Sequence, residues 1–76
     1  MTQSVIAVFP GTFDPITLGH QDLIHRAARM FGTVIVAVAV AHHKKTLFTL
    51  DERLDAVRAV FKPQANVQVE SFTGLV

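Results

Sequence analysis

The 76-residue sequence predicts an α/β fold in which three short strands alternate with two amphipathic helices. Three observations support this prediction. Three apolar runs are spaced along the chain, segments with apolar residues at helical spacing lie between them, and glycine or proline follows the first run and each helical segment. Half of the residues are hydrophobic, which favours a packed core over a disordered chain.

The three apolar runs are typical of strands. Residues 5–9 form a continuous apolar run closed by Pro10 and Gly11, and residues 34–40 are rich in β-branched side chains. Residues 67–72 begin with alternating apolar and polar residues, so we expect one face of this third strand to be less buried. Continuous apolar strands favour a parallel sheet.

Apolar residues at helical spacing predict two helices between the strands. Gly32 is expected to end the first helix, and Lys62–Pro63 the second. Thr49 and Glu52 form a capping box at the start of the second helix. The apolar stripe of the first helix consists of Leu23, Ile24, Ala27, Ala28 and Phe31, and that of the second of Leu50, Leu54, Val57 and Phe61. The residues expected on the solvated face of the second helix are Asp51, Glu52, Arg53, Asp55 and Arg58.

The order β-α-β-α-β predicts parallel strands joined by right-handed crossovers. Three strands with two helices correspond to the mononucleotide-binding half of a Rossmann-like doubly wound parallel sheet. In such a half the first strand lies innermost, where a second half would pair with it. We therefore expect residues 1–76 to be the N-terminal half of a single domain whose C-terminal half is absent from this chain. The unpaired apolar strand would favour self-association.

Composition excludes several classes of function. The sequence has no cysteine, which rules out disulfides, thiolate catalysis and cysteine-based zinc sites. The net charge of +1 shows no bias toward nucleic acid or a membrane surface. The longest apolar run, residues 34–41, is too short to span a bilayer, and residues 1–4 lack the features of a secretory signal. We expect a cytoplasmic protein with no nucleic-acid or membrane partner.

Residues 10–20 link the first strand to the first helix and are the most informative segment. Open α/β sheets bind ligands outside the carboxyl ends of their strands. Gly11 lets the backbone turn and approach a ligand, and the helix start offers unpaired N–H groups to an anion. The segment matches neither the P-loop nor the G-x-G-x-x-G pattern. Phosphate is the expected occupant.

His20 follows Gly19 in the first turn of the helix, and we expect it to point inward toward the strand ends, where imidazole can donate a hydrogen bond to a phosphate oxygen. The alternative is a semi-buried histidine with a purely structural role. Thr12 and Asp14 also have structural alternatives, a turn-stabilising hydroxyl and an Asx-turn before Pro15.

The runs PGTFDPITLGHQD and KKTLFTLDER resemble the phosphopantetheine adenylyltransferases of bacterial coenzyme A synthesis. These enzymes belong to a nucleotidylyltransferase superfamily with a Thr/His-x-Gly-His motif, which corresponds here to residues 17–20. The resemblance covers the whole chain and roughly the first half of a family member. Other superfamily members remain an alternative. Nicotinate-mononucleotide enzymes usually carry His where Thr17 stands, and glycerol-phosphate cytidylyltransferases differ around Pro15–Ile16.

The resemblance implies adenylyl transfer from ATP to 4′-phosphopantetheine, giving dephospho-coenzyme A and pyrophosphate, in a homohexamer with Mg²⁺. The substrate phosphate would attack ATP directly, so catalysis would rest on positioning and on charge stabilisation. We expect the 76-residue chain alone to be inactive, because the family's triphosphate-binding arginines and Ser-rich helix start lie beyond this segment. A non-catalytic module that binds phosphate or self-associates is a further alternative.

The resemblance also implies residue roles. His20 would be catalytic and donate to the α-phosphate, and Gly19 would allow close approach of the nucleotide. The Thr12 hydroxyl and the Phe13 N–H would hold the attacking phosphate and contact the nucleotide. Lys44 would bind the same phosphates. Gly74 would begin the pantetheine-side segment, and Gly11, Asp14 and Gly19 would shape the loop. No metal-binding residue is expected, because the adjacent histidines 42 and 43 rarely reach one ion together.

Overall fold

A computed structural model describes residues 5–40 and 45–73. The chain forms β1 (Ile6–Gly11), α1 (Leu18–Met30), β2 (Thr33–Ala39), α2 (Leu50–Phe61) and β3 (Val67–Phe72). The three strands make one parallel sheet in the order β1-β2-β3. The predicted β-α-β-α-β arrangement is confirmed, and it matches half of a doubly wound α/β sheet.

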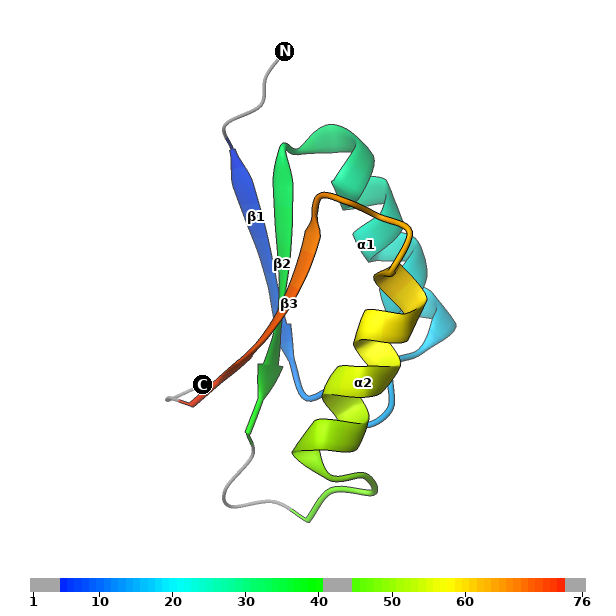
Figure 1. Ribbon diagram of the computed structural model, residues 1–76, viewed down its shortest axis with the longest axis vertical. Helices are drawn as coiled ribbons and strands as arrows, with labels where there is room; N and C mark the ends of the chain where they lie inside the picture. Colours follow the sequence, from blue (N-terminus) through cyan, green and yellow to red (C-terminus); the bar gives the residue numbers. More distant parts are fainter. Residues whose placement is uncertain (1–4, 41–44, 74–76) are drawn as a thin grey trace.

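Both helices cover the same face of the sheet (Figure 1). β2, the central strand, supplies Val34, Val36 and Val38, which are completely buried beneath the helices. The helices contribute the buried apolar side chains of Ile24, Ala27, Leu54, Val57 and Phe61, and Phe13 in the loop after β1 completes the core. These helical residues belong to the two predicted stripes, whereas Leu23, which was also expected in the first stripe, is 56% exposed.

The opposite face of the sheet carries no helix in the described part of the chain (Figure 1). Ala7 and Phe9 of β1 pack against the core, whereas Ile6 and Val8 alternate with them and are 57% and 56% exposed. β1 continues two residues beyond the predicted strand, through Pro10 and Gly11. In the described sheet β1 is an edge strand, and Pro10 lies next to its carboxyl end, where a missing N–H disturbs the ladder least.

The ends of the helices follow the predicted signals. α1 ends at Met30, Phe31 is its C-cap, and Gly32 follows. The Asn66 side chain donates to the carbonyl oxygens of Ala28 and Phe31, which satisfies acceptors at this helix end. The capping box of α2 is present as predicted, since Thr49 Oγ1 accepts from the Glu52 N–H and Glu52 accepts from the Thr49 N–H.

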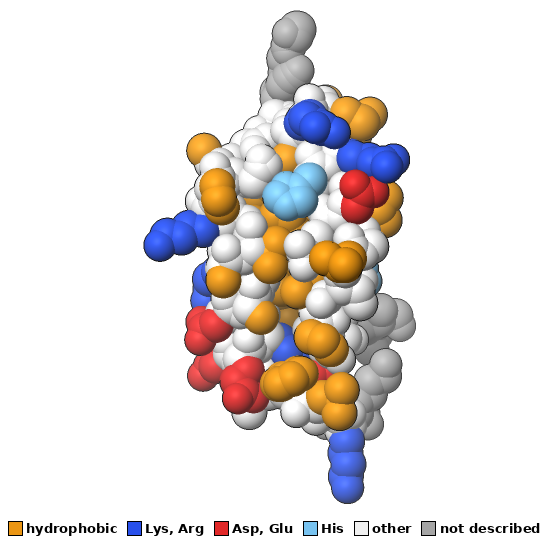
Figure 2. All heavy atoms as spheres, turned by 90° about the vertical axis from the view of Figure 1, so that its right-hand side faces the viewer, with side chains coloured by type: hydrophobic (Ala, Val, Ile, Leu, Met, Phe, Trp, Pro, Cys, Tyr) orange, Lys and Arg blue, Asp and Glu red, His pale blue; other side chains and the backbone are white. Residues whose placement is uncertain are grey.

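Seen from the helical side, hydrophobic side chains form a broken stripe along the long axis of the molecule, and acidic side chains gather at the lower left (Figure 2). Acidic residues Asp51 and Glu52 occupy the first turn of α2, where they complement the positive end of the helix dipole. Neither α1 nor α2 is long and apolar enough to cross a membrane, and these are the helices of the described residues.

Candidate functional site

The carboxyl ends of β1 and β2 lie side by side, because Gly11 pairs in register with Val38. The segment that follows β1 leads to the start of α1, at the lower end of the sheet in Figure 1. This is the place where open α/β sheets bind ligands. The residues that the sequence analysis singled out between positions 11 and 20 therefore gather at this edge.

Phe13 anchors the loop after β1. Its side chain is only 5% exposed and its backbone has a φ of 51°, a left-handed conformation that is uncommon for a residue with a side chain. Gly11 lies against the Phe13 ring, and a Cβ at Gly11 would approach the ring to 3.1 Å. A side chain at position 11 would therefore require the Phe13 ring to shift by a few tenths of an ångström. Such left-handed conformations are frequent at functional sites.

Thr17 and His20 form a capping box at the start of α1 that the sequence analysis missed. The Thr17 N–H donates to His20 Nδ1 over 3.1 Å, and the His20 N–H donates to Thr17 Oγ1 over 3.2 Å. A box normally carries Glu or Gln at the fourth position, so the T-x-x-H pattern was not recognised. Because a backbone nitrogen can only donate, Nδ1 must accept, and the ring proton of neutral His20 is on Nε2.

His20 is exposed, unlike Ile24 and Ala27 on the same helix, so it does not point into the core. The His20 side chain turns toward the N-cap residue Thr17 instead. Its ring lies edge-on to the Phe13 ring, with centroids 4.9 Å apart. Within the described residues Nε2 makes no hydrogen bond, which leaves a donor beside the loop and the helix N-terminus. The ring therefore has both a structural role through Nδ1 and a free donor.

Asp14 joins two loops that are distant in sequence. Its carboxylate accepts from the N–H groups of Leu47 and Phe48, over 2.6 and 2.9 Å. The Asx-turn considered for this residue is not what the carboxylate makes, whereas the expected loop-shaping role is supported by these bonds. The bonds tie the loop after β1 to the segment that precedes α2.

Arg53 contradicts the sequence-based expectation most clearly. The charge pattern predicts a solvated position on α2, but Arg53 is 2% exposed and its guanidinium is hydrogen-bonded to backbone carbonyl oxygens. The accepting oxygens belong to Thr12, Ala39, Val40 and Phe48, at 2.9, 2.7, 3.5 and 3.2 Å. A signal was present in the sequence, because position 53 lies three residues after Leu50 and four before Val57, on the apolar stripe.

The remaining predicted site residues have varied outcomes. Thr12 lies in the loop after β1 and is half-buried. Gly19 is exposed in the first turn of α1, where an added Cβ would meet nothing closer than Thr17 Oγ1 at 3.7 Å. Lys44, Gly74 and the histidines at 42 and 43 lie outside the described residues. Within residues 5–40 and 45–73, no group of three His, Asp or Glu side chains could hold a metal ion.

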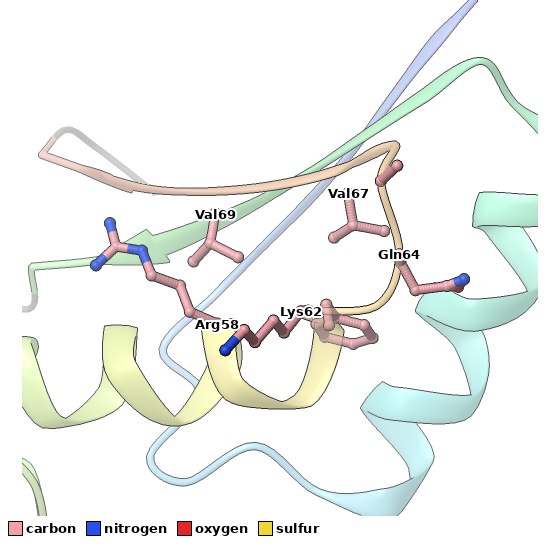
Figure 3. Close-up of a pocket in the computed structure, with 7 residues that line it drawn as sticks. Arg58, Lys62, Gln64, Val67 and Val69 are labelled. Atoms are coloured by element: carbon pink, nitrogen blue, oxygen red, sulfur yellow. The ribbon is translucent and has the colours of Figure 1, made fainter.

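An open groove of about 350 Å³ lies at the other end of the sheet (Figure 3). Phe61, Val67 and Val69 line it, with Arg58 and Lys62. Val67 is the first residue of β3, so the groove is at the amino end of this strand. It is therefore separate from the site at the carboxyl ends of β1 and β2.

The fold and the site are those of the nucleotide-binding α/β class, in which the loop after the first strand and the N-terminus of the first helix meet at the strand ends. A family model described as cytidylyltransferase-like matches residues 8–76. The chain belongs to this cytidylyltransferase-like family.

The curated relatives carry a more specific name. A phosphopantetheine adenylyltransferase of Acidovorax sp. (strain JS42) is 68% identical over 72 residues, which are 95% of this chain and 44% of the relative. Enzymes of the same name from Heliobacterium modesticaldum and Bordetella pertussis are 54% and 51% identical, over 93% and 95% of this chain and 42% and 43% of theirs. The resemblance inferred from the sequence is confirmed. The chain spans less than half the length of these relatives.

Proposed function

We propose that this chain supplies the phosphate-binding half of a phosphopantetheine adenylyltransferase, which transfers adenylate from ATP to 4′-phosphopantetheine. The observation that carries the proposal is the capping box of α1, in which Thr17 holds His20 Nδ1 and leaves Nε2–H free as a donor. The names of the relatives support the substrates. The cytidylyltransferase-like family supports nucleotidyl transfer as the type of reaction.

In the proposed reaction, a phosphate oxygen of 4′-phosphopantetheine attacks the α-phosphorus of ATP. One P–O bond forms, the bond to the bridging oxygen breaks, and pyrophosphate leaves, so no covalent protein intermediate is needed. Nε2–H of His20 donates to an α-phosphate oxygen, where negative charge develops in the transition state. The Thr12 hydroxyl, the Phe13 N–H and the first turn of α1 bind phosphate oxygens. Gly19 leaves room for the nucleotide against the helix, because its position lacks a side chain.

We propose that Mg²⁺ enters with ATP and is held mainly by phosphate oxygens and water. The carboxylate of Asp14, in the loop after β1, already accepts two backbone N–H groups. On the strength of the resemblance, the proposal also includes Lys44 as a contact of the phosphates and Gly74 as a contact of pantetheine. On the same ground we propose a homohexamer and a cytoplasmic location.

The test uses the extended chain, which we define as this chain joined to the part of the Acidovorax sp. protein that follows the matched segment. We expect it to release pyrophosphate only when ATP and 4′-phosphopantetheine are both present, with dephospho-coenzyme A identified by mass. We expect the 76-residue chain alone to release none. The assignment of substrate would be refuted if the extended chain does not adenylylate 4′-phosphopantetheine and instead turns over CTP with glycerol phosphate, or nicotinate mononucleotide.

A further inference from the structure

Arg53 is a charged side chain in an unusual place. It is 2% exposed, and all its hydrogen bonds within the described residues go to backbone carbonyl oxygens. Burying a guanidinium is costly unless its donors are satisfied, and an apolar residue would fill the same position without that cost. The position therefore calls for an explanation beyond packing.

The accepting carbonyl groups belong to three segments that meet at the carboxyl edge of the sheet. Thr12 follows β1, Ala39 ends β2, and Phe48 precedes α2. Nη1 bridges Thr12 O and Ala39 O over 2.9 and 2.7 Å, and Nε reaches Phe48 O over 3.2 Å. A planar guanidinium presents its donors in a fixed fork, so it can hold these three segments in one relative arrangement.

The bond to Thr12 O has a direct consequence for the site. The peptide group between Thr12 and Phe13 is trans and planar, so its C=O and its N–H point in opposite directions. When Arg53 holds the carbonyl oxygen of Thr12 toward the protein interior, the Phe13 N–H is turned away from Arg53. A cation on the carbonyl also polarises the peptide group, which strengthens its N–H as a donor.

We infer that Arg53 is a positioning residue, which acts through the Thr12–Phe13 peptide group to aim the Phe13 N–H at the phosphate. The inference rests on the proposed function, in which that N–H binds the attacking phosphate. Asp14 supports the same arrangement from the other side, because its carboxylate holds the Leu47 and Phe48 N–H groups next to the Phe48 carbonyl that Arg53 binds. Arg53 makes no contact with substrate in this scheme.

The test compares Arg53→Lys and Arg53→Met in the extended chain, with Arg58→Met as the matched control. Arg58 is an exposed arginine on the same helix. After correction for the folded fraction, we expect kcat of both Arg53 variants to fall about 10- to 100-fold, because a displaced donor weakens transition-state stabilisation. The KM for ATP should change less. The control should keep its wild-type kcat. Arg53→Lys should keep more of the wild-type stability than of the wild-type kcat, because an ammonium lacks the planar fork of donors.

A second measurement follows the Phe13 amide by NMR in the 76-residue chain. We expect its chemical shift and hydrogen exchange to change in Arg53→Lys and to stay unchanged in Arg58→Met. A wild-type kcat and an unchanged Phe13 amide in folded Arg53→Lys would overturn the inference. If the unsubstituted extended chain shows no adenylyl transfer, the proposed function fails, and the Phe13 amide alone then decides whether Arg53 positions this peptide group.

Discussion

The backbone nitrogen of Thr17 lies 3.1 Å from Nδ1 of His20, so the imidazole of the proposed catalytic residue is also part of the helix cap. The bond assigns the ring proton to Nε2, since a backbone N–H can only donate. One side chain thus satisfies an orphan donor of the turn and presents a donor to the site.

The first prediction concerns this tautomer. In ¹⁵N NMR of the neutral histidine, we expect Nε2 to carry the proton in the 76-residue chain. Thr17→Ala keeps the backbone N–H that donates to Nδ1, so we expect the Nε2–H tautomer to persist, while the free energy of unfolding falls by about 1 kcal/mol because the cap hydroxyl is lost. Thr17→Ser keeps the hydroxyl and serves as the control. A predominant Nδ1–H form in the unsubstituted chain would contradict the capping geometry.

The two roles of His20 can be separated by substitution. His20→Gln places a usual capping-box residue at this position, so we expect the stability to be largely retained. His20→Ala removes the cap partner and should cost about 0.5–1 kcal/mol of unfolding free energy. In the extended chain, we expect the alanine variant to lose about 10²- to 10³-fold in kcat, because one transition-state donor is removed. Turnover of the alanine variant at the unsubstituted rate would remove His20 from the proposed mechanism.

We expect Asp14 to contribute more to the free energy of unfolding than an ordinary surface carboxylate does. Asp14→Asn replaces one carboxylate oxygen with an NH₂ group, which cannot accept from Leu47 or Phe48. We expect a loss of about 1–3 kcal/mol in the free energy of unfolding, measured with urea. Asp22→Asn is the control, because Asp22 makes an exposed ion pair with Arg26 that should contribute less than about 1 kcal/mol. Equal losses of unfolding free energy for the two substitutions would show that the Asp14 hydrogen bonds stabilise the fold no more than an exposed ion pair does.

Gly19 and Gly11 should respond to alanine in opposite ways. The Cβ added by Gly19→Ala clashes with nothing, so we expect this substitution to raise the free energy of unfolding by up to about 1 kcal/mol. In the extended chain, we expect it to raise the KM for ATP. Gly11→Ala drives a methyl group to within 3.1 Å of the Phe13 ring and should lower stability. If Gly19→Ala leaves nucleotide binding unchanged, the ligand does not lie against the first turn of α1.

The open face of β1 predicts self-association of the 76-residue chain. Val8 is 56% exposed on β1, and Val8→Lys places a charge there. We expect light scattering to show smaller assemblies of this variant at equal concentration. Leu23→Lys is the matched control, because Leu23 is also 56% exposed but lies on α1. An identical effect of both substitutions would indicate nonspecific hydrophobic contact rather than association through the sheet.

Local patterns were sufficient where the stabilising partners are close in sequence. The three strands, both helices and the Thr49–Glu52 box follow from periodicity and from residues three or four positions apart. The same reasoning missed the Thr17–His20 box, although it is equally local, because histidine is not the residue that usually completes one. It also predicted that residues 12–17 link the first strand to the first helix, as the structure has them.

The sequence by itself determined the α/β class, the order of elements, the buried stripes and the loop that carries Gly11, Thr12 and Phe13. Only the tertiary structure decided that Arg53 is buried and that Asp14 joins two loops. The physical reason is the distance along the chain between the interacting groups. Arg53 binds a carbonyl 41 residues away and Asp14 an amide 33 residues away. A charged residue on a helix is solvated by default, and it is buried here because strand ends brought together by the fold present carbonyl oxygens to it.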